Sequence, residues 1–324
     1  MYHAHFHLTQ EPFGVSPDCR FFYQTEQHGE ALATLYYAIQ QRRGFALLVG
    51  RPGLGKTSIL VQVVQMLEGK AEIAYLPHPY YDRSTVLESI LLSLGLPAGP
   101  SLAQSHRVFY EYLTKLRLSG KTCVVLLDEA QDLDLSTLEA IRMLSNFETP
   151  SEKLLQIVLA GQPRLAETLK QPECEQLQQR MNVIARLEPL ADREVQDYIE
   201  HRLNAAGSSS KLFLPDALEA VVAASHGVPR NVNTICFNAL TLAYALNRQH
   251  VGFEDVAEAV RDLDLSVELP VVLPSKSDPQ NEAPASEPSF RPPSRSPRPA
   301  VINQILADRI LASASAPRGR SALH

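Results

Sequence analysis

Hydrophobic and polar positions follow two alternating patterns over most of the chain. Short continuous apolar runs between polar residues are typical of strands buried on both faces. Between these runs, apolar residues recur at helical spacing, which together predicts a parallel sheet with right-handed crossovers and flanking helices. The predicted strands are 45–49 (FALLV), 72–76 (EIAYL), 123–128 (CVVLLD), 155–161 (LQIVLAG) and 183–187 (VIARL).

The pattern changes after residue 188, where the strand-like runs stop and helical periodicity continues alone. We therefore predict an α/β domain over residues 1–188 and a small all-helical domain over residues 189–266. The two patterns together predict an α/β fold with a five-stranded parallel sheet and a separate helical domain.

Residues 267–324 differ in composition from the rest of the chain. Ten of the 23 prolines lie in residues 270–324, where seven Lys or Arg against four Asp or Glu give a net charge of +3, and this composition predicts a disordered, Pro/Ser/Arg-rich tail over residues 267–324. Within it, residues 300–311 (AVINQILADRIL) have apolar residues at roughly helical spacing. These residues are either a short docking helix or a disordered segment with incidental aliphatic side chains, because an isolated helix this short is marginal in water.

Composition limits the classes of function. The chain has 324 residues, of which 45% are apolar and 20% charged, as in a globular protein. Residues 1–269 carry 23 Lys or Arg against 32 Asp or Glu, and an acidic body argues against broad wrapping by nucleic acid. The sequence has neither a long apolar stretch nor an N-terminal signal pattern, so we expect no direct membrane span and a cytoplasmic location. The four widely spaced cysteines are expected to be reduced thiols.

A glycine-rich turn interrupts the first strand–helix unit, GFALLVGRPGLGKTSILVQVV (44–64). Gly50, Gly55, Lys56 and Thr57 match the phosphate-loop pattern G-x-x-x-x-G-K-[ST] in the strand-to-helix context that it requires. Backbone N–H groups and the helix N-terminus would surround phosphate, Lys56 would reach the outer phosphates, and the Thr57 hydroxyl would ligate Mg²⁺. The predicted phosphate-binding residues are Gly50, Arg51, Pro52, Gly53, Leu54, Gly55, Lys56, Thr57 and Ser58.

An acidic pair follows the third predicted strand, in VVLLDEAQDL, about 70 residues after the glycine-rich turn. Asp128 is placed to hold Mg²⁺, and Glu129 is placed to polarise an attacking water molecule. Such a pair can also be a solvated turn, but its position directly after a buried strand favours a catalytic role. Because nucleotide binding alone needs only the aspartate, the glutamate indicates hydrolysis.

With both motifs present, the chain resembles the AAA+ ATPases. More narrowly, it is similar to the general secretion pathway protein A (ExeA-type) group, through an N-terminal signature resembling EPFGVSPDCRFFYQTEQHGEALATLYYAI. The resemblance covers roughly residues 1–265 and implies a P-loop AAA+ core, a helical lid domain over residues 189–266, ATP and Mg²⁺ as cofactors, and a homo-oligomer that hydrolyses ATP.

The resemblance also assigns individual residues. Gln162, in IVLAGQPRL, matches the position that senses the γ-phosphate, and Arg230, in HGVPRNVNTIC, matches a lid arginine that contacts the nucleotide of its own subunit. The segment LQQRMNVIARLEPL resembles the one that carries the arginine finger, for which Arg180 is the first candidate and Arg186 the second.

The same resemblance places the N-terminal aromatic segment near adenine. Phe22, Tyr23 and His28 are the candidate neighbours of the base. Aromatic residues at such spacing are also common in hydrophobic cores, and the residues themselves do not decide between the two roles.

Two hypotheses of function follow. In the first, the protein is an ATP-hydrolysing assembly motor or regulator of a secretion, pilus or polysaccharide export system, working through protein partners of an envelope assembly. In the second, it is a DNA-dependent ATPase that regulates transposition. The acidic body and the tail that follows the lid, in place of a DNA-reading module, favour the first hypothesis.

Overall fold

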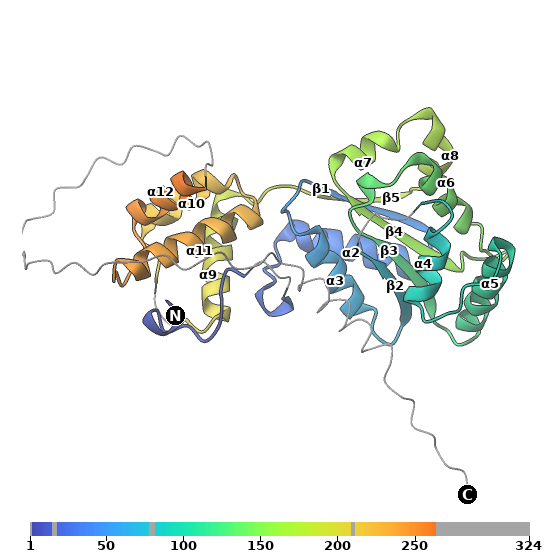
Figure 1. Ribbon diagram of the computed structural model, residues 1–324, viewed down its shortest axis with the longest axis horizontal. Helices are drawn as coiled ribbons and strands as arrows, with labels where there is room; N and C mark the ends of the chain where they lie inside the picture. Colours follow the sequence, from blue (N-terminus) through green and yellow to red (C-terminus); the bar gives the residue numbers. More distant parts are fainter. Residues whose placement is uncertain (1, 15–17, 78–81, 209–210, 264–324) are drawn as a thin grey trace, which may run out of the picture. The chain divides into compact units, whose positions relative to one another are not determined.

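One parallel sheet forms the centre of the α/β region. The structure is a computed structural model that describes residues 2–14, 18–77, 82–208 and 211–263. The strands found in these residues are β1 Phe45–Gly50, β2 Ala71–Leu76, β3 Thr122–Leu127, β4 Leu155–Gly161 and β5 Val183–Leu187. They lie in the order β2-β3-β4-β1-β5, and every neighbouring pair is parallel (Figure 1). The predicted five-stranded parallel sheet is confirmed.

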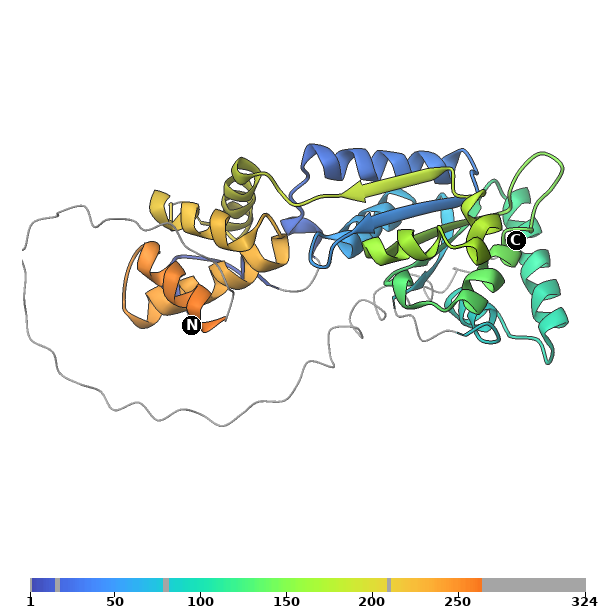
Figure 2. The same cartoon turned by 90° about the horizontal axis from the view of Figure 1, so that it is seen from above.

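Helices connect the strands and cover both faces of the sheet. Their bounds are α2 Glu26–Gln40, α3 Lys56–Met66, α4 Val86–Ser93, α5 Leu102–Leu118, α6 Leu135–Leu144, α7 Pro163–Thr168 and α8 Glu175–Gln178. Single 3₁₀ turns are η1 Cys19–Phe21, η2 Ala130–Asp132 and η3 Pro172–Cys174. Figure 2 shows α2 running along one face of the sheet beside β5.

Burial explains why the inner strands are continuous apolar runs. Every residue of β1 and β4 is buried, whereas the outer strands β2 and β5 contain partly or fully exposed positions. Successive side chains point to opposite faces. Phe45, Leu47 and Val49 pack with α4 to α8, and Ala46 and Leu48 pack with α2 and α3. Two apolar cores therefore hold the sheet and fix where its carboxyl ends lie.

A group of helices follows β5 in the chain: α9 Asp192–Ala205, α10 Pro215–Ser225, α11 Pro229–Ala245 and α12 Phe253–Asp262. Pro215 and Pro229 occupy the first position of their helices, where the missing N–H costs no hydrogen bond. The helices share a third apolar core, which includes Ile199, Val221 and Ile235. All-helical structure after β5 is therefore present in the described residues.

The N-terminal residues pack with this helical group. Tyr2 of the short helix α1 (Tyr2–His5), Phe6 and Phe13 belong to the third core, and the rings of Phe13 and Phe213 lie 6.1 Å apart. The described residues all fall in one compact unit, Met1–Leu269. The domain boundaries at residues 188 and 266 stay predictions.

Three further predictions concern the tail, membrane-spanning helices and the cysteines. The tail (267–324) and its docking helix (300–311) lie outside the described residues. Among the helices that are described, none has both the length and the apolar character needed to cross a membrane. The four cysteines are free thiols.

Candidate nucleotide-binding site

The glycine-rich turn joins β1 to α3. Gly53 and Gly55 have φ angles of +83° and +91°, in the left-handed region that favours glycine. A Cβ atom on Gly53 would lie 2.9 Å from side-chain atoms of both Val228 and Arg230, so this position also needs glycine for close packing. The turn leaves the N-terminus of α3 facing the cavity, where backbone N–H groups attract anions.

Lys56 begins α3 and is buried, with 5% of the residue exposed. Its Nζ donates hydrogen bonds to the carbonyl oxygens of Gly50 (3.0 Å) and Arg51 (3.3 Å). Burial lowers the pKa of the Lys56 ammonium, and the negative charges of Glu129 and Asp128 partly offset this effect. An anionic ligand at the turn would therefore meet a cation that is already desolvated and oriented.

Asp128 comes directly after β3 and is almost fully buried. The Thr57 hydroxyl donates to its Oδ2 at 2.6 Å, the Tyr75 hydroxyl lies 3.3 Å from the same oxygen, and the Glu129 N–H donates to Oδ1 at 2.9 Å. Burial raises the pKa of the Asp128 carboxyl, whereas the hydrogen bonds from Thr57 and Glu129 lower it. Tyr75 is a contact that the sequence patterns did not indicate.

Glu129 occupies a turn in the left-handed region, with φ = +50°, which is uncommon for a residue other than glycine. This conformation follows Asp128 immediately and brings Glu129 to the cavity wall. Its Oε2 accepts a hydrogen bond from Nε2 of Gln131 at 2.9 Å. The Gln131 Oε1 accepts from the backbone N–H of Gln162 at 3.0 Å, so one glutamine side chain joins the ends of β3 and β4.

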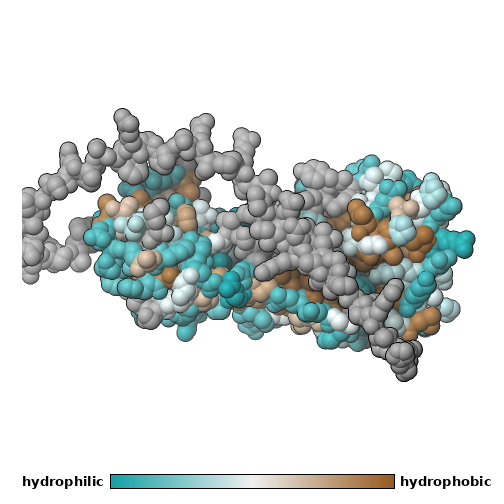
Figure 3. All heavy atoms as spheres, turned by 60° about the horizontal axis from the view of Figure 1, so that its bottom comes forward, coloured by the Kyte–Doolittle hydropathy of each residue, from teal (hydrophilic) through white to brown (hydrophobic). Residues whose placement is uncertain are grey.

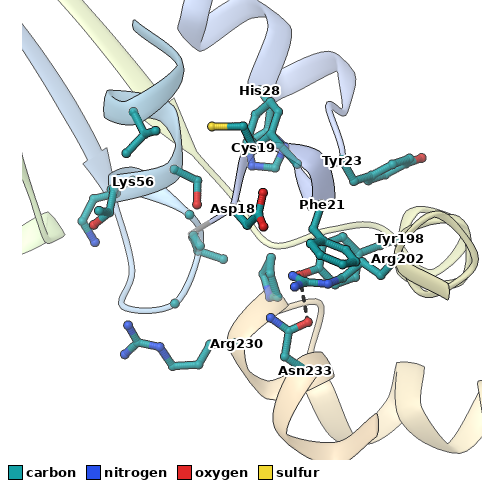
Figure 4. A pocket seen from close by; sticks show the side chains of 18 of the residues that line it. Asp18, Cys19, Phe21, Tyr23, His28, Lys56, Tyr198, Arg202, Arg230 and Asn233 are labelled. Atoms are coloured by element: carbon teal, nitrogen blue, oxygen red, sulfur yellow. Dashed lines mark hydrogen bonds between the residues drawn. The ribbon is translucent and has the colours of Figure 1, made fainter. Parts of the chain in front are cut away.

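A cavity of about 340 Å³ opens beside the glycine-rich turn (Figure 4). Phe22, Tyr23 and His28 line it, and their role as neighbours of a base stays a prediction. Burial lowers the pKa of His28, and its Nδ1 lies 2.9 Å from the Thr25 hydroxyl oxygen. The predicted residues of the turn that line the same cavity are Gly53, Leu54, Gly55, Lys56, Thr57 and Ser58.

Another wall of the cavity carries residues that sequence reasoning missed. Arg202 of α9, with 7% of the residue exposed, donates to the Tyr198 hydroxyl (2.7 Å) and to the Pro12 carbonyl (2.5 Å). Tyr198 donates to Oδ1 of Asn233 on α11 at 2.9 Å (Figure 4). The Arg202 guanidinium also lies over the Phe21 ring, 5.1 Å from its centre. Helical periodicity indicates the buried face of α9, but it does not indicate a cavity there.

The predicted arginines occupy two different environments. Arg230 lines the cavity, and its backbone N–H donates to the Gly53 carbonyl at 3.3 Å. Arg180 instead donates through Nη1 to Ser145 and, at 2.7 Å, to Oδ1 of Asn146, just after α6. Arg186 is an exposed residue of the outer strand β5. Neither Arg180 nor Arg186 is among the residues that line the described cavity.

The strand order, the phosphate-loop turn after β1 and the acidic pair after β3 define a P-loop protein of the AAA+ class. A family profile described as "AAA domain" matches residues 39–169. General secretion pathway protein A of Aeromonas hydrophila is 38% identical over 265 residues, which are 81% of this chain and 48% of that protein. The chain therefore contains an AAA domain of the kind found in general secretion pathway protein A.

The chain spans about half the length of that curated relative. Two solved structures share the fold at low identity. Cdc6p of Pyrobaculum aerophilum has a TM-score of 0.61 at 19% identity, covering 78% of this chain and 70% of its own. The Aeropyrum pernix ORC2 protein, in ADPNP–ADP complexes, has a TM-score of 0.58 at 18% identity, covering 77% and 72%.

Proposed function

We propose that the protein binds ATP with Mg²⁺ in this cavity and hydrolyses ATP to ADP and phosphate. The observation that carries the proposal is the 2.6 Å hydrogen bond between Thr57 and Asp128, residues 71 positions apart in the chain. It joins the phosphate-binding turn to the acidic pair in one site. Nucleotide binding is also in keeping with the family and with the ADPNP–ADP complexes of the structurally similar ORC2 protein.

The oxygen atoms at this site fit Mg²⁺. A hydroxyl and a carboxylate lie within hydrogen-bonding distance of each other, and Mg²⁺ is usually held by one or two such protein ligands together with water and phosphate oxygens. Thr57 and Asp128 would hold the ion. When bound, Mg²⁺ neutralises charge that develops on the phosphate oxygens.

Other residues of the chain would bind the phosphates, activate the water molecule and contact the nucleotide. Lys56 and the N–H groups of the turn would hold the β- and γ-phosphates. Glu129 would accept a proton from a water molecule while the water oxygen bonds to the γ-phosphorus, and the bond from that phosphorus to the bridging oxygen breaks to release ADP. Gln162 would contact the γ-phosphate from the end of β4, and Arg230 would contact the nucleotide from α11.

At the level of the cell, we propose a cytoplasmic motor or regulator of a secretion, pilus or polysaccharide export assembly. Support comes from the similarity to general secretion pathway protein A and from apolar side chains on the surface. Leu92 of α4, Leu118 of α5 and Met143 of α6 are exposed, and one face of the molecule shows apolar patches between hydrophilic residues (Figure 3). Such patches often mark protein contacts.

Replacing Glu129 tests the proposed reaction. Glu129→Gln keeps the side-chain volume and leaves Asp128 unchanged, so we expect near-normal ATP affinity and at least about a hundredfold slower phosphate release, as for loss of a general base. Mg²⁺-dependent phosphate release should be measured beside equilibrium ATP binding. Unchanged turnover would overturn the proposed hydrolysis by Glu129.

A comparison of activators tests the proposed pathway. Phosphate release by the wild-type protein should increase with envelope fractions and remain unchanged with duplex DNA. Stimulation by DNA alone would instead support the DNA-dependent ATPase that regulates transposition.

A further inference from the structure

Gln131 is a buried glutamine of η2 that uses its whole amide group. Its residue exposure is 7%. Nε2 donates to Oε2 of Glu129 (2.9 Å) and to Oδ2 of Asp132 (3.0 Å), while Oε1 accepts from the backbone N–H of Gln162 (3.0 Å). The opposite orientation of the amide would bring its oxygen against two carboxylates and its NH₂ against an N–H group. The contacts therefore allow one orientation.

The backbone around Gln131 allows its side chain to reach both Glu129 and Gln162. Gly161, the last residue of β4, has its ideal Cβ position 3.1 Å from the Gln131 Oε1 and 3.2 Å from the Gln131 backbone nitrogen. The same Cβ position lies 2.8 Å from Cδ2 of Leu165, so an alanine there would press on both residues and the close approach favours glycine. On the other side, the left-handed turn at Glu129 directs its carboxylate toward the Gln131 amide.

We propose that Gln131 is a positioning residue for ATP hydrolysis, which rests on the function proposed above. The Gln131 side chain holds the Glu129 carboxylate at the cavity. It also connects that carboxylate to Gln162, the residue between β4 and α7. It acts through Glu129 and touches no reacting atom. A shift of the β4–α7 junction on nucleotide binding would be transmitted to the carboxylate through this single side chain.

Two substitutions separate the donor and acceptor contacts of Gln131. Gln131→Met has nearly the same length and loses both contacts. Gln131→Glu can still accept from the Gln162 N–H but offers an oxygen to Glu129 in place of a donor. Because the lost hydrogen bond is to a charged group, we expect kcat to fall about tenfold or more in both variants, with the ATP dissociation constant changed less than about threefold.

Gln156 provides a matched control. It is also buried, with 2% exposed, and it also bridges two segments, by accepting from the Gly44 N–H (2.8 Å) and donating to the Lys153 carbonyl (3.1 Å). It lies at the opposite end of β4 from Gln162. Gln156→Met should lower the unfolding temperature at least as much as Gln131→Met and leave kcat within about twofold of wild type.

A double substitution identifies the route of the effect. If Gln131 acts through Glu129, adding Gln131→Met to Glu129→Gln should lower kcat no further. A normal kcat in Gln131→Met and Gln131→Glu, or an additive loss in the double variant, overturns the positioning role while leaving the proposed hydrolysis intact. Full turnover in Glu129→Gln alone overturns both. If Gln131→Met does not fold, Gln131→Glu carries the same comparison.

Discussion

Two residues of the candidate site are assigned to different tasks, binding and cleavage. Lys56 donates to two carbonyl oxygens of the glycine-rich turn, so its charge is directed at the space where phosphate would bind. Glu129 follows Asp128 directly, has a left-handed backbone conformation and accepts a hydrogen bond from Gln131. Substitutions at Lys56 should therefore change affinity, whereas those at Glu129 should change the chemical step.

We expect Lys56→Ala to weaken ATP binding about ten- to over a hundredfold, because it removes a charged donor to phosphate worth roughly 1.5–3 kcal/mol. Equilibrium titration with a fluorescent ATP analogue measures this change. Lys170→Ala is the control, since Lys170 is an exposed lysine that does not line the cavity, and its affinity should match wild type. Undiminished binding by Lys56→Ala would contradict the phosphate-loop assignment.

At the scale of elements, Arg202 connects three segments around the cavity. Its guanidinium joins α9 to the Pro12 carbonyl and the Phe21 ring, and through Tyr198 it is linked to Asn233 on α11. The Pro12 contact spans 190 residues of sequence. The N-terminal segment is therefore part of the cavity wall because a helix late in the chain holds it there.

Arg202→Met should lower the free energy of unfolding by about 1–3 kcal/mol, because it retains the packing of the side chain but leaves buried acceptors without their donor. Urea denaturation followed by circular dichroism gives this value. Arg107→Met is the comparison: Arg107 pairs with Glu111 across one turn of α5 with 80% of its side chain exposed, so its removal should leave stability unchanged. Equal midpoints for both variants would show that the Arg202 contacts add no net stability.

At the scale of the whole molecule, neither candidate arginine finger is among the residues that line the cavity of its own chain. Arg180 is bound to the residues that follow α6, and Arg186 lies on the outer strand β5. A finger acting on the nucleotide of a neighbouring subunit would need a head-to-tail contact between copies. Activity should then increase with protein concentration.

Mixing two impaired variants tests this arrangement, at an ATP concentration too low for Lys56→Ala to bind the nucleotide. Lys56→Ala lacks an intact phosphate loop and Arg180→Ala lacks the first candidate finger. In a mixed oligomer, the intact phosphate loop of an Arg180→Ala subunit can meet the intact Arg180 of a Lys56→Ala subunit. Since an arginine finger is worth roughly 10³–10⁵ in rate in related phosphoryl-transfer systems, phosphate release by the mixture should recover measurably. A mixture that co-assembles but stays inactive, with Arg186→Ala giving the same result, would exclude a finger acting between subunits.

Local patterns were sufficient to predict the strands and the two motifs. The apolar run predicted as strand 123–128 is β3, Thr122–Leu127, and the run predicted as 183–187 is β5. The turn glycines and the Asp128–Glu129 pair could also be recognised in the sequence. Backbone φ angles, strand burial and the starts of helices depend on residues only a few positions apart. These features define the class of fold and one side of the candidate site.

The sequence by itself therefore determined the parallel sheet, the phosphate-loop turn and the acidic pair. Only the tertiary structure decided that Tyr75 contacts Asp128, that Gln131 joins Glu129 to Gln162, and that Tyr198, Arg202 and Asn233 line the cavity. These contacts link residues on different strands and helices, and a periodic pattern indicates which face of an element is buried without naming what lies against it. Strand order and helix packing set those neighbours, because they bring distant segments within hydrogen-bonding distance.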